Sequence, residues 1–246
     1  AGYALGYVGG GLLLALNLAW ILKPALFGLP SGPGMTPSQA TLPTRLAFVS
    51  VAVWWLTFGA VSLRGMPEPA ITSPASARRA PIRAAFRQLA HTWTLLRRYP
   101  QAGILLAAFL VYNDGIQTII KMATAYGTEI GIGQSALIGS ILLVQFVGIP
   151  CAFLFGALAG RIGSKRAILL GLGVYGVIAV LGYFMRTGTH FLILALLVGT
   201  VQGGTQALSR SLFASLIPPA RSGEFFGLFS VFEKVAGIFG PLFFAA

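Results

Sequence analysis

The 246-residue chain is 56% hydrophobic and only 9% charged, whereas soluble domains carry about 25% charged residues. A water-soluble fold could not cover this much apolar surface, so the composition excludes an ordinary soluble protein. A net charge of +12 would suggest a nucleic-acid partner in a soluble protein, but here the basic residues gather in particular loops and we expect no nucleic-acid partner.

Seven apolar segments approach the length of about 20 residues that a helix needs to cross the hydrocarbon layer of a membrane. They are residues 2–22, 45–63, 102–122, 136–158, 167–186, 191–216 and 226–246. The sequence therefore predicts an all-α, polytopic helical membrane protein with about seven transmembrane helices. Gly171 to Gly176 matches a G-x-G-x-x-G pattern, but it lies inside an apolar segment with no strand before it, so we reject a dinucleotide site.

The connector of residues 64–100 is strongly basic, with seven arginines and one acidic residue, Glu68. Its apolar residues recur at helical spacing, which predicts an amphipathic helix. These residues are Ile82, Phe86, Leu89, Trp93 and Leu96. Such a helix either lies along the anionic headgroups of the cytoplasmic leaflet or packs against the ends of the protein's own helices. The sequence leaves both interpretations open.

Loop charges predict the orientation in the membrane. With residues 64–100, 161–166 and 217–225 on the cytoplasmic side, the inner loops and their edges hold eleven Lys and Arg residues and the outer ones three. Basic loops favour the cytoplasmic side. We therefore place residues 23–44, 125–134 and 187–190 outside.

Polar residues inside the apolar segments are candidate functional groups, because charges and amides are costly in hydrocarbon. At a rise of about 1.5 Å per residue, Asp114, Gln145 and Gln202 each lie about 18 to 20 Å from the inner edge of their segments. Transporter substrate sites lie near this depth. We expect these three side chains to face one wet chamber at the bilayer midplane.

Further polar residues extend this candidate site along two segments. Asn113 and Gln117 share a helix face beside Asp114, and Gln206 lies one turn from Gln202. Loss of water favours the protonated form of a carboxylate, so Asp114 is a candidate for the acid that couples solute movement to protons. A structural salt bridge or helix-to-helix hydrogen bond fits the sequence of this region equally well. Lys121, near the outer end, is interpreted as a snorkelling lysine.

Arg210 and Glu233 lie at a similar depth, about 9 to 11 Å from the inner edge of the last two segments. An isolated charge there needs a partner, so we predict that Arg210 and Glu233 form an ion pair, or that Glu233 pairs with Lys234 instead. Such a pair is a candidate inner gate that breaks when a cavity opens inward. A permanent packing contact is the alternative.

The short basic loop at residues 156–166 resembles the G-x-L-x-D-R-x-G-R-R/K signature of the major facilitator superfamily. The matching residues are Gly156, Leu158, Arg161, Gly163, Lys165 and Arg166. The resemblance implies a gating role for Arg161, Lys165 and Arg166. Gly160 replaces the usual acidic residue, which removes a charge that could pair with a nearby arginine.

Other stretches resemble the vacuole effluxer-like branch of that superfamily, which includes bacterial members and a fungal vacuolar protein linked to amino-acid release after autophagy. They are residues 2–11, 53–55, 112–118, 202–211 and 224–227. The resemblance implies a bacterial member of a twelve-helix, two-bundle fold that is monomeric at full length, of which this chain is a fragment. Residues 1–64 would then end the N-terminal bundle, 65–100 form the cytoplasmic central loop, and 101–246 begin the C-terminal bundle.

These patterns favour a secondary transporter that moves a small polar solute, with amino acids implied by the resemblance. The sequence contains no phosphate-binding G-x-x-x-x-G-K-[ST] loop. Neither His91 nor His190 has acidic or thiol partners at catalytic or metal-ligand spacing, so we expect no enzyme, metal site or cofactor. The alternative is a membrane scaffold or sensor that uses the amphipathic helix. The expected location is the bacterial inner membrane.

Overall fold

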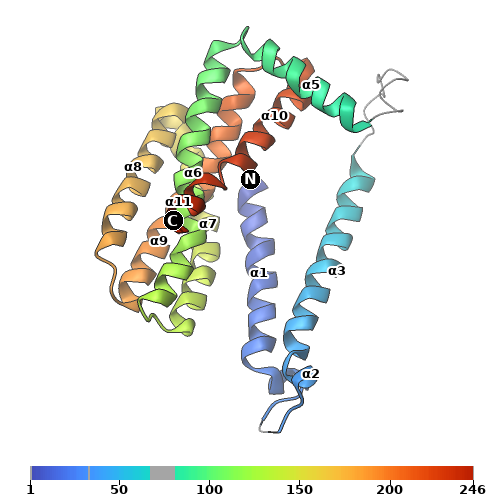
Figure 1. The fold of residues 1–246 in the computed structure, drawn as a ribbon, viewed down its shortest axis with the longest axis vertical. Coiled ribbons are helices and arrows are strands. Elements are labelled where there is room, and N and C mark those ends of the chain that lie inside the picture. The colour runs from blue at the N-terminus through green and yellow to red at the C-terminus, as the bar shows by residue number, and fades with distance from the viewer. Residues whose placement is uncertain (1, 33, 67–80, 246) are drawn as a thin grey trace. The chain divides into compact units, whose positions relative to one another are not determined.

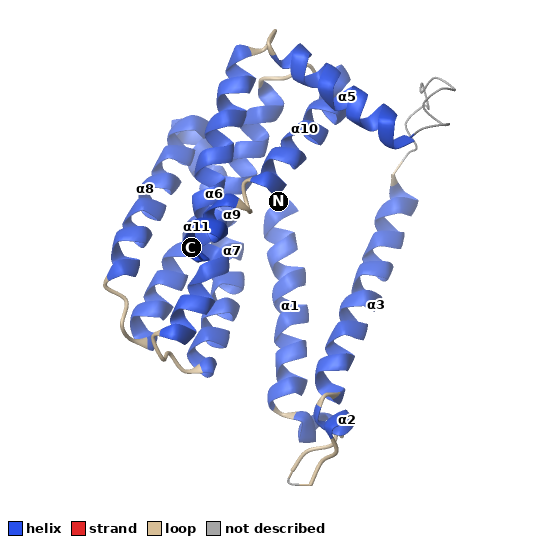
Figure 2. Ribbon diagram, viewed as in Figure 1, coloured by secondary structure: helices blue, strands red, loops and turns tan. Residues whose placement is uncertain are grey.

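The computed structural model describes residues 2–32, 34–66 and 81–245, whose regular structure is helical throughout (Figure 2). Seven helical segments in these ranges are long and apolar enough to cross a membrane, as the sequence predicts, and the seventh, Pro219–Leu242, is interrupted by turns. The residues outside these ranges include Arg78 and Arg79 of the basic connector.

The chain forms two compact units. Residues 8–73 form one, and residues 1–7 with residues 74–246 form the other. The amphipathic helix of the basic connector therefore belongs to the second unit, with the C-terminal helices.

The first unit contains two long antiparallel helices, α1 (Gly2–Leu22) from residue 8 onward and α3 (Leu42–Gly65), with the short helices η1 (Pro24–Phe27) and α2 (Pro37–Ala40) between them (Figure 1). Each short helix begins at a proline, which suits the first helical turn because that turn needs no backbone N–H bond. Asn17 and Ser50 connect the long helices, since Ser50 Oγ donates to Asn17 Oδ1 over 2.8 Å.

The second unit is built on four long helices that run up and down. They are α6 (Pro100–Glu129), α7 (Gln134–Ile162), α8 (Ser164–Tyr183) and α9 (Gly188–Ser215). The α6–α7 and α8–α9 connections lie at one end, and the α7–α8 turn lies at the other, together with η2 (Pro219–Arg221) and the start of α6 (Figure 1). The basic turn at 161–166 thus lies at the same end of this unit as the described part of the basic connector.

Glycines let α9 pack closely in the middle of this unit. A Cβ at Gly204 would overlap the Phe155 ring of α7, and one at Gly199 would press on Val144 and Val147. On α8, Gly171 leaves room for Thr205 of α9. The first glycine of the G-x-G-x-x-G match is therefore a packing residue inside a helix.

The last apolar segment is divided into two helices, α10 (Ser222–Val235) and α11 (Phe239–Ala245), where the sequence predicted one. Residues 236–238 form turns between them. An aromatic cluster holds α10 to α6 and α9: the Phe229 ring lies 4.3 Å from Phe109 and 5.1 Å from Phe213, centroid to centroid.

The amphipathic helix α5 (Pro81–Leu96) packs with only its second half. Leu96 is 7% exposed in the core, and Trp93 stacks on Phe232 of α10 with centroids 5.9 Å apart. In the first half, Ile82 and Phe86 are 74% and 69% exposed. Packing on the protein's own helices therefore accounts for the second half of the apolar stripe and leaves the first half uncovered in this unit.

Candidate functional site

A cavity of about 670 Å³ opens between α6, α7, α8 and α9 in the second unit. Each helix contributes lining residues, such as Tyr126, Gln145, Ile178 and Gln202. A cavity of this size suits a small organic molecule.

The lining is mostly apolar, and none of the described lining residues is acidic, basic or a histidine. Two of the lining hydroxyls are already used within their own helices, because Thr118 Oγ1 donates to Asp114 O and Ser140 Oγ donates to Ala136 O. Among the described residues, the Gln145 and Gln202 amides have no such bond. Together with the hydroxyls of Thr124, Tyr126 and Tyr183, which also have no hydrogen bond within the described ranges, these amides can bind polar atoms of a guest.

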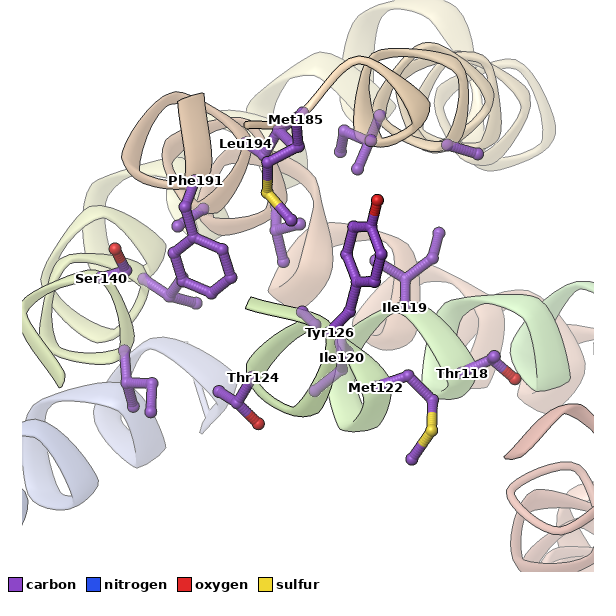
Figure 3. Close-up of a pocket in the computed structure, with 18 of the residues that line it drawn as sticks. Thr118, Ile119, Ile120, Met122, Thr124, Tyr126, Ser140, Met185, Phe191 and Leu194 are labelled. Atoms are coloured by element: carbon purple, nitrogen blue, oxygen red, sulfur yellow. The ribbon is translucent and has the colours of Figure 1, made fainter. Parts of the chain in front are cut away.

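The apolar wall is formed by aromatic and thioether side chains. Tyr126 extends from α6 toward Met185, and Phe191 and Ser140 approach from neighbouring helices (Figure 3). Phe191 and Met185 belong to a buried cluster with Ile132 and Leu137. The cluster lies at the end of the unit that holds the α6–α7 and α8–α9 connections. A guest molecule would therefore meet large apolar surfaces on several sides.

The structure brings two of the six predicted binding residues together at the cavity. Gln145 and Gln202 both line it, whereas the other four predicted residues are not among its lining. These four are Asn113, Asp114, Gln117 and Gln206. The expectation that Asp114, Gln145 and Gln202 face one chamber is therefore met for the two glutamines and not for the aspartate.

Asn113 is the most buried of the other four, at 2% exposed, and its Nδ2 atom has no hydrogen-bond partner among the described residues. Its neighbour Tyr112 bonds Ser209 of α9 over 2.6 Å between hydroxyl oxygens. Gln117 and Gln206 are half-buried. None of these side chains lines the cavity.

Asp114 faces α11. Its Oδ1 atom accepts a hydrogen bond from the backbone N–H of Gly240 over 3.0 Å. Lys121, two turns along the same helix, donates from Nζ to the carbonyl oxygen of Gly237 over 2.8 Å. In the structure the Lys121 ammonium group therefore binds the backbone of the last segment, and its interpretation as a snorkelling lysine stays a prediction.

The predicted pairing of Arg210 with Glu233 is confirmed. Arg210 Nη2 donates to both carboxylate oxygens of Glu233, at 2.8 Å and 2.6 Å, and the guanidinium lies 5.7 Å from the centre of the Phe229 ring. This pair connects α9 to α10, and it is the only ion pair within the described part of the chain.

Arg161, Lys165 and Arg166 lie at the exposed α7–α8 turn. Gly163 turns the chain there with a φ of +88°, a value that favours glycine. None of the three basic side chains has an ion-pair partner in the described ranges. Their gating role stays a prediction.

Sequence reasoning missed the apolar cavity wall and the partners of Asp114. Tyr126, Met185 and Phe191 give no signal in the sequence, because apolar residues are expected throughout a membrane helix. The Gly240-Pro241 pair did carry a signal, since proline interrupts backbone hydrogen bonding. It marks the break that Asp114 and Lys121 contact.

Comparison with known proteins supports a transporter family. The family model described as "Vacuole effluxer Atg22 like" matches residues 1–246. The MFS-type transporter YxiO of Bacillus subtilis, itself described as uncharacterized, is 35% identical over 99% of this chain and 55% of its own length. Autophagy-related protein 22-2 of Emericella nidulans is 27% identical over 98% of this chain and 44% of its own length.

The chain therefore spans about half the length of the curated relatives it matches. No solved structure matches it. The seven apolar helices and the transporter relatives together make it a multi-pass membrane protein. With a family model that matches from its first residue to its last, the chain belongs to the Atg22-like vacuole effluxer family, a group of the major facilitator type.

Proposed function

We propose that this chain is part of a secondary active transporter that moves a small polar solute by alternating access. The observation that supports it most directly is the cavity between α6 and α9, which both Gln145 and Gln202 line. Transporter sites are formed between helices near the middle of the membrane. The family relationship supports the same function.

The lining suggests which solutes fit. A net charge moved into a cavity without charged side chains would lose its hydration without an opposing charge, so the cargo carries no net charge. Two amides can bind its polar groups and the aromatic wall can cover an apolar part. Amino acids, which are zwitterionic at neutral pH, are the first class to test.

Solute flux into liposomes that contain the full-length protein tests this proposal. Gln145→Leu and Gln202→Leu should each lower kcat/KM about 3- to 10-fold, because each removes one hydrogen bond to the cargo. Gln101→Leu is the matched control, since Gln101 is an exposed glutamine at the start of α6, away from the cavity. Equal rates in protein-containing and empty liposomes would contradict a transport function.

Proton coupling through Asp114 is a separate part of the proposal. If its carboxylate takes up a proton in each cycle, a pH gradient should drive uptake by the native protein. Asp114→Asn cannot bind that proton, so it should exchange solute across the membrane without accumulating it. Accumulation by the Asn variant would assign the coupling to another group.

We further propose that the Arg210–Glu233 pair, with Arg161, Lys165 and Arg166, controls the inner opening. The pair connects α9 to α10, so separating these helices requires breaking it. The proposed setting is the inner membrane of a bacterium, as a monomer without cofactors or catalytic chemistry.

A scaffold or sensor is the second candidate, and the exposed half of α5 favours it. Ile82 and Phe86 are exposed beside Arg83 and Arg87, with no acidic residue in the helix. This combination suits an anionic lipid surface. The flux experiment separates the two candidates, because a scaffold moves no solute with or without a pH gradient.

A further inference from the structure

The break between α10 and α11 follows from one residue, Pro241. Proline has no backbone N–H, so the carbonyl of Gly237, four residues earlier, loses its helical donor, and the proline ring crowds that carbonyl. Gly237 and Ile238 instead donate to carbonyls three residues back, at 3.2 Å and 3.1 Å. The helix narrows, stops, and begins again at Phe239.

The break leaves several backbone groups without helical partners, and two of them are contacted by α6. One is the Gly237 carbonyl. The other is the Gly240 N–H, because the first N–H groups of any helix have no acceptor in the preceding turn. In a membrane span such groups cannot rely on water and need a partner from the protein.

Two charged side chains of α6 satisfy these two groups. Lys121 Nζ donates to Gly237 O over 2.8 Å, and Asp114 Oδ1 accepts from Gly240 N over 3.0 Å. The two side chains are seven residues apart, about two helical turns, and so project from the same side of α6. Hydrogen bonds to charged groups are about twice as strong as neutral ones.

The two glycines allow this close approach. A Cβ at Gly237 would lie 2.7 Å from Lys121 Nζ, and a Cβ at Gly240 would overlap the side chain of Thr118. Thr118 and Met122, which flank the cavity on α6, are neighbours of these contacts in the sequence. The break is therefore fastened to the helix that forms one wall of the cavity.

We propose that Asp114 and Lys121 form a clamp on the proline break: they are positioning residues that replace two of the backbone hydrogen bonds lost there and hold α11 to the cavity-lining helix α6. The clamp exists in the folded protein whether or not solute is moved. It also explains why two charged residues lie inside an apolar segment without contacting the cavity.

A double-mutant comparison of thermal unfolding of the full-length protein tests the lysine. Lys121→Met should lower Tm by about 3 to 8 °C, the loss expected for one charged hydrogen bond. In a Pro241→Ala background the same change should cost little, because the alanine N–H can donate to Gly237 O. Lys234→Met is the control, since Lys234 is an exposed lysine at the end of α10.

Equal loss of Tm from Lys121→Met in both backgrounds would overturn the clamp, since the lysine would then act elsewhere. If the Lys121→Met protein does not fold, the yield of folded protein in the two backgrounds replaces Tm as the measurement. Rescue of folding by Pro241→Ala supports the clamp, and failure of that rescue contradicts it.

Amide hydrogen exchange tests the aspartate. Asp114→Leu should speed exchange in the peptide that contains Gly240 about 10- to 100-fold, because it removes the charged acceptor. Asp114→Asn keeps a carbonyl oxygen at this position and should lie between the leucine variant and the native protein. Unchanged exchange in the leucine variant would overturn this half of the clamp.

A kinetic comparison separates positioning from cargo binding, and it alone rests on the proposed function. Lys121→Met should lower kcat and leave KM unchanged, because Lys121 does not line the cavity. A tenfold rise in KM with unchanged kcat would assign the lysine to the cargo instead. The unfolding and exchange experiments need no solute, so failure of the clamp and failure of the transport function give different results.

Discussion

Single glycines decide how closely the helices of the second unit approach one another. Gly204 touches the Phe155 ring, and Phe155 is itself 7% exposed in the buried cluster that joins α7, α8 and α9. By contrast, Gly173 of α8 has open space where its side chain would be. The same residue type therefore serves packing at one position and not at the other.

Gly204→Ala should unfold the protein at a markedly lower temperature, because the added methyl group overlaps the Phe155 ring and neither helix can move without losing contacts. We expect a loss of about 1 to 3 kcal/mol. Gly173→Ala should leave Tm unchanged or raise it slightly, since alanine favours a helix more than glycine does. Thermal unfolding in detergent measures both, and similar Tm values for the two variants would contradict this account.

The Arg210–Glu233 pair permits a reciprocal experiment. Arg210→Glu places two acids together and Glu233→Arg places two bases together, so each single reversal should abolish most of the flux. The double variant restores opposite charges between α9 and α10 and should recover it. If the double variant stays as inactive as the single ones, pairing is not what the two residues contribute.

At the scale of elements, α5 shows one helix in two environments. Leu96 and Trp93 pack against the aromatic residues of α10, whereas Phe86 is exposed. The periodicity of the sequence predicts the apolar stripe over its whole length and cannot say which half is covered, because that depends on how α10 packs against α5 in three dimensions.

Leu96→Ala should therefore destabilise the protein by about 2 to 5 kcal/mol, the range found for buried leucines. Phe86→Ala removes a larger side chain and should change Tm by less than the leucine variant, because little of it is buried. Unfolding curves of the two variants in the same detergent decide this. A greater loss from the phenylalanine would mean that the first half of α5 also packs on protein.

Within elements, sequence reasoning succeeded where the signal is local. Long apolar runs predicted the spans, and the equal depths of Gln145 and Gln202 predicted that they share a chamber. The direction of Asp114 could not be predicted this way, because depth along a helix does not give the side on which a residue lies. Its partner, Gly240, is 126 residues away in the sequence. The Gly240 N–H is free of a helical acceptor only because Pro241 interrupts the span.

At the scale of the whole molecule, the distribution of charges predicts which ends of the helices face the cytoplasm. The α7–α8 turn carries Arg161, Lys165 and Arg166, whereas the α8–α9 connection carries Arg186 alone. The helices of the second unit alternate in direction. Once one connection is assigned to the cytoplasmic or the outer side of the membrane, the sides of the other connections in this unit follow.

Thiol labelling in intact cells tests this orientation, and the chain suits it because Cys151 is its single cysteine. In a Cys151→Ser background, Thr189→Cys should react with a membrane-impermeant maleimide added outside. Lys165→Cys should react only after the membrane is permeabilised. Both positions are exposed, and the opposite pattern would invert the proposed topology.

The uncharged lining of the cavity has an electrical consequence. Moving one elementary charge across a membrane potential of 100 mV changes its energy by about 2.3 kcal/mol. Because neither the described cavity residues nor a neutral cargo carries net charge, any effect of voltage on flux must come from ions that accompany the solute. Current per transported molecule in voltage-clamped vesicles therefore counts those ions, and a cargo that crosses alone should produce no current at all.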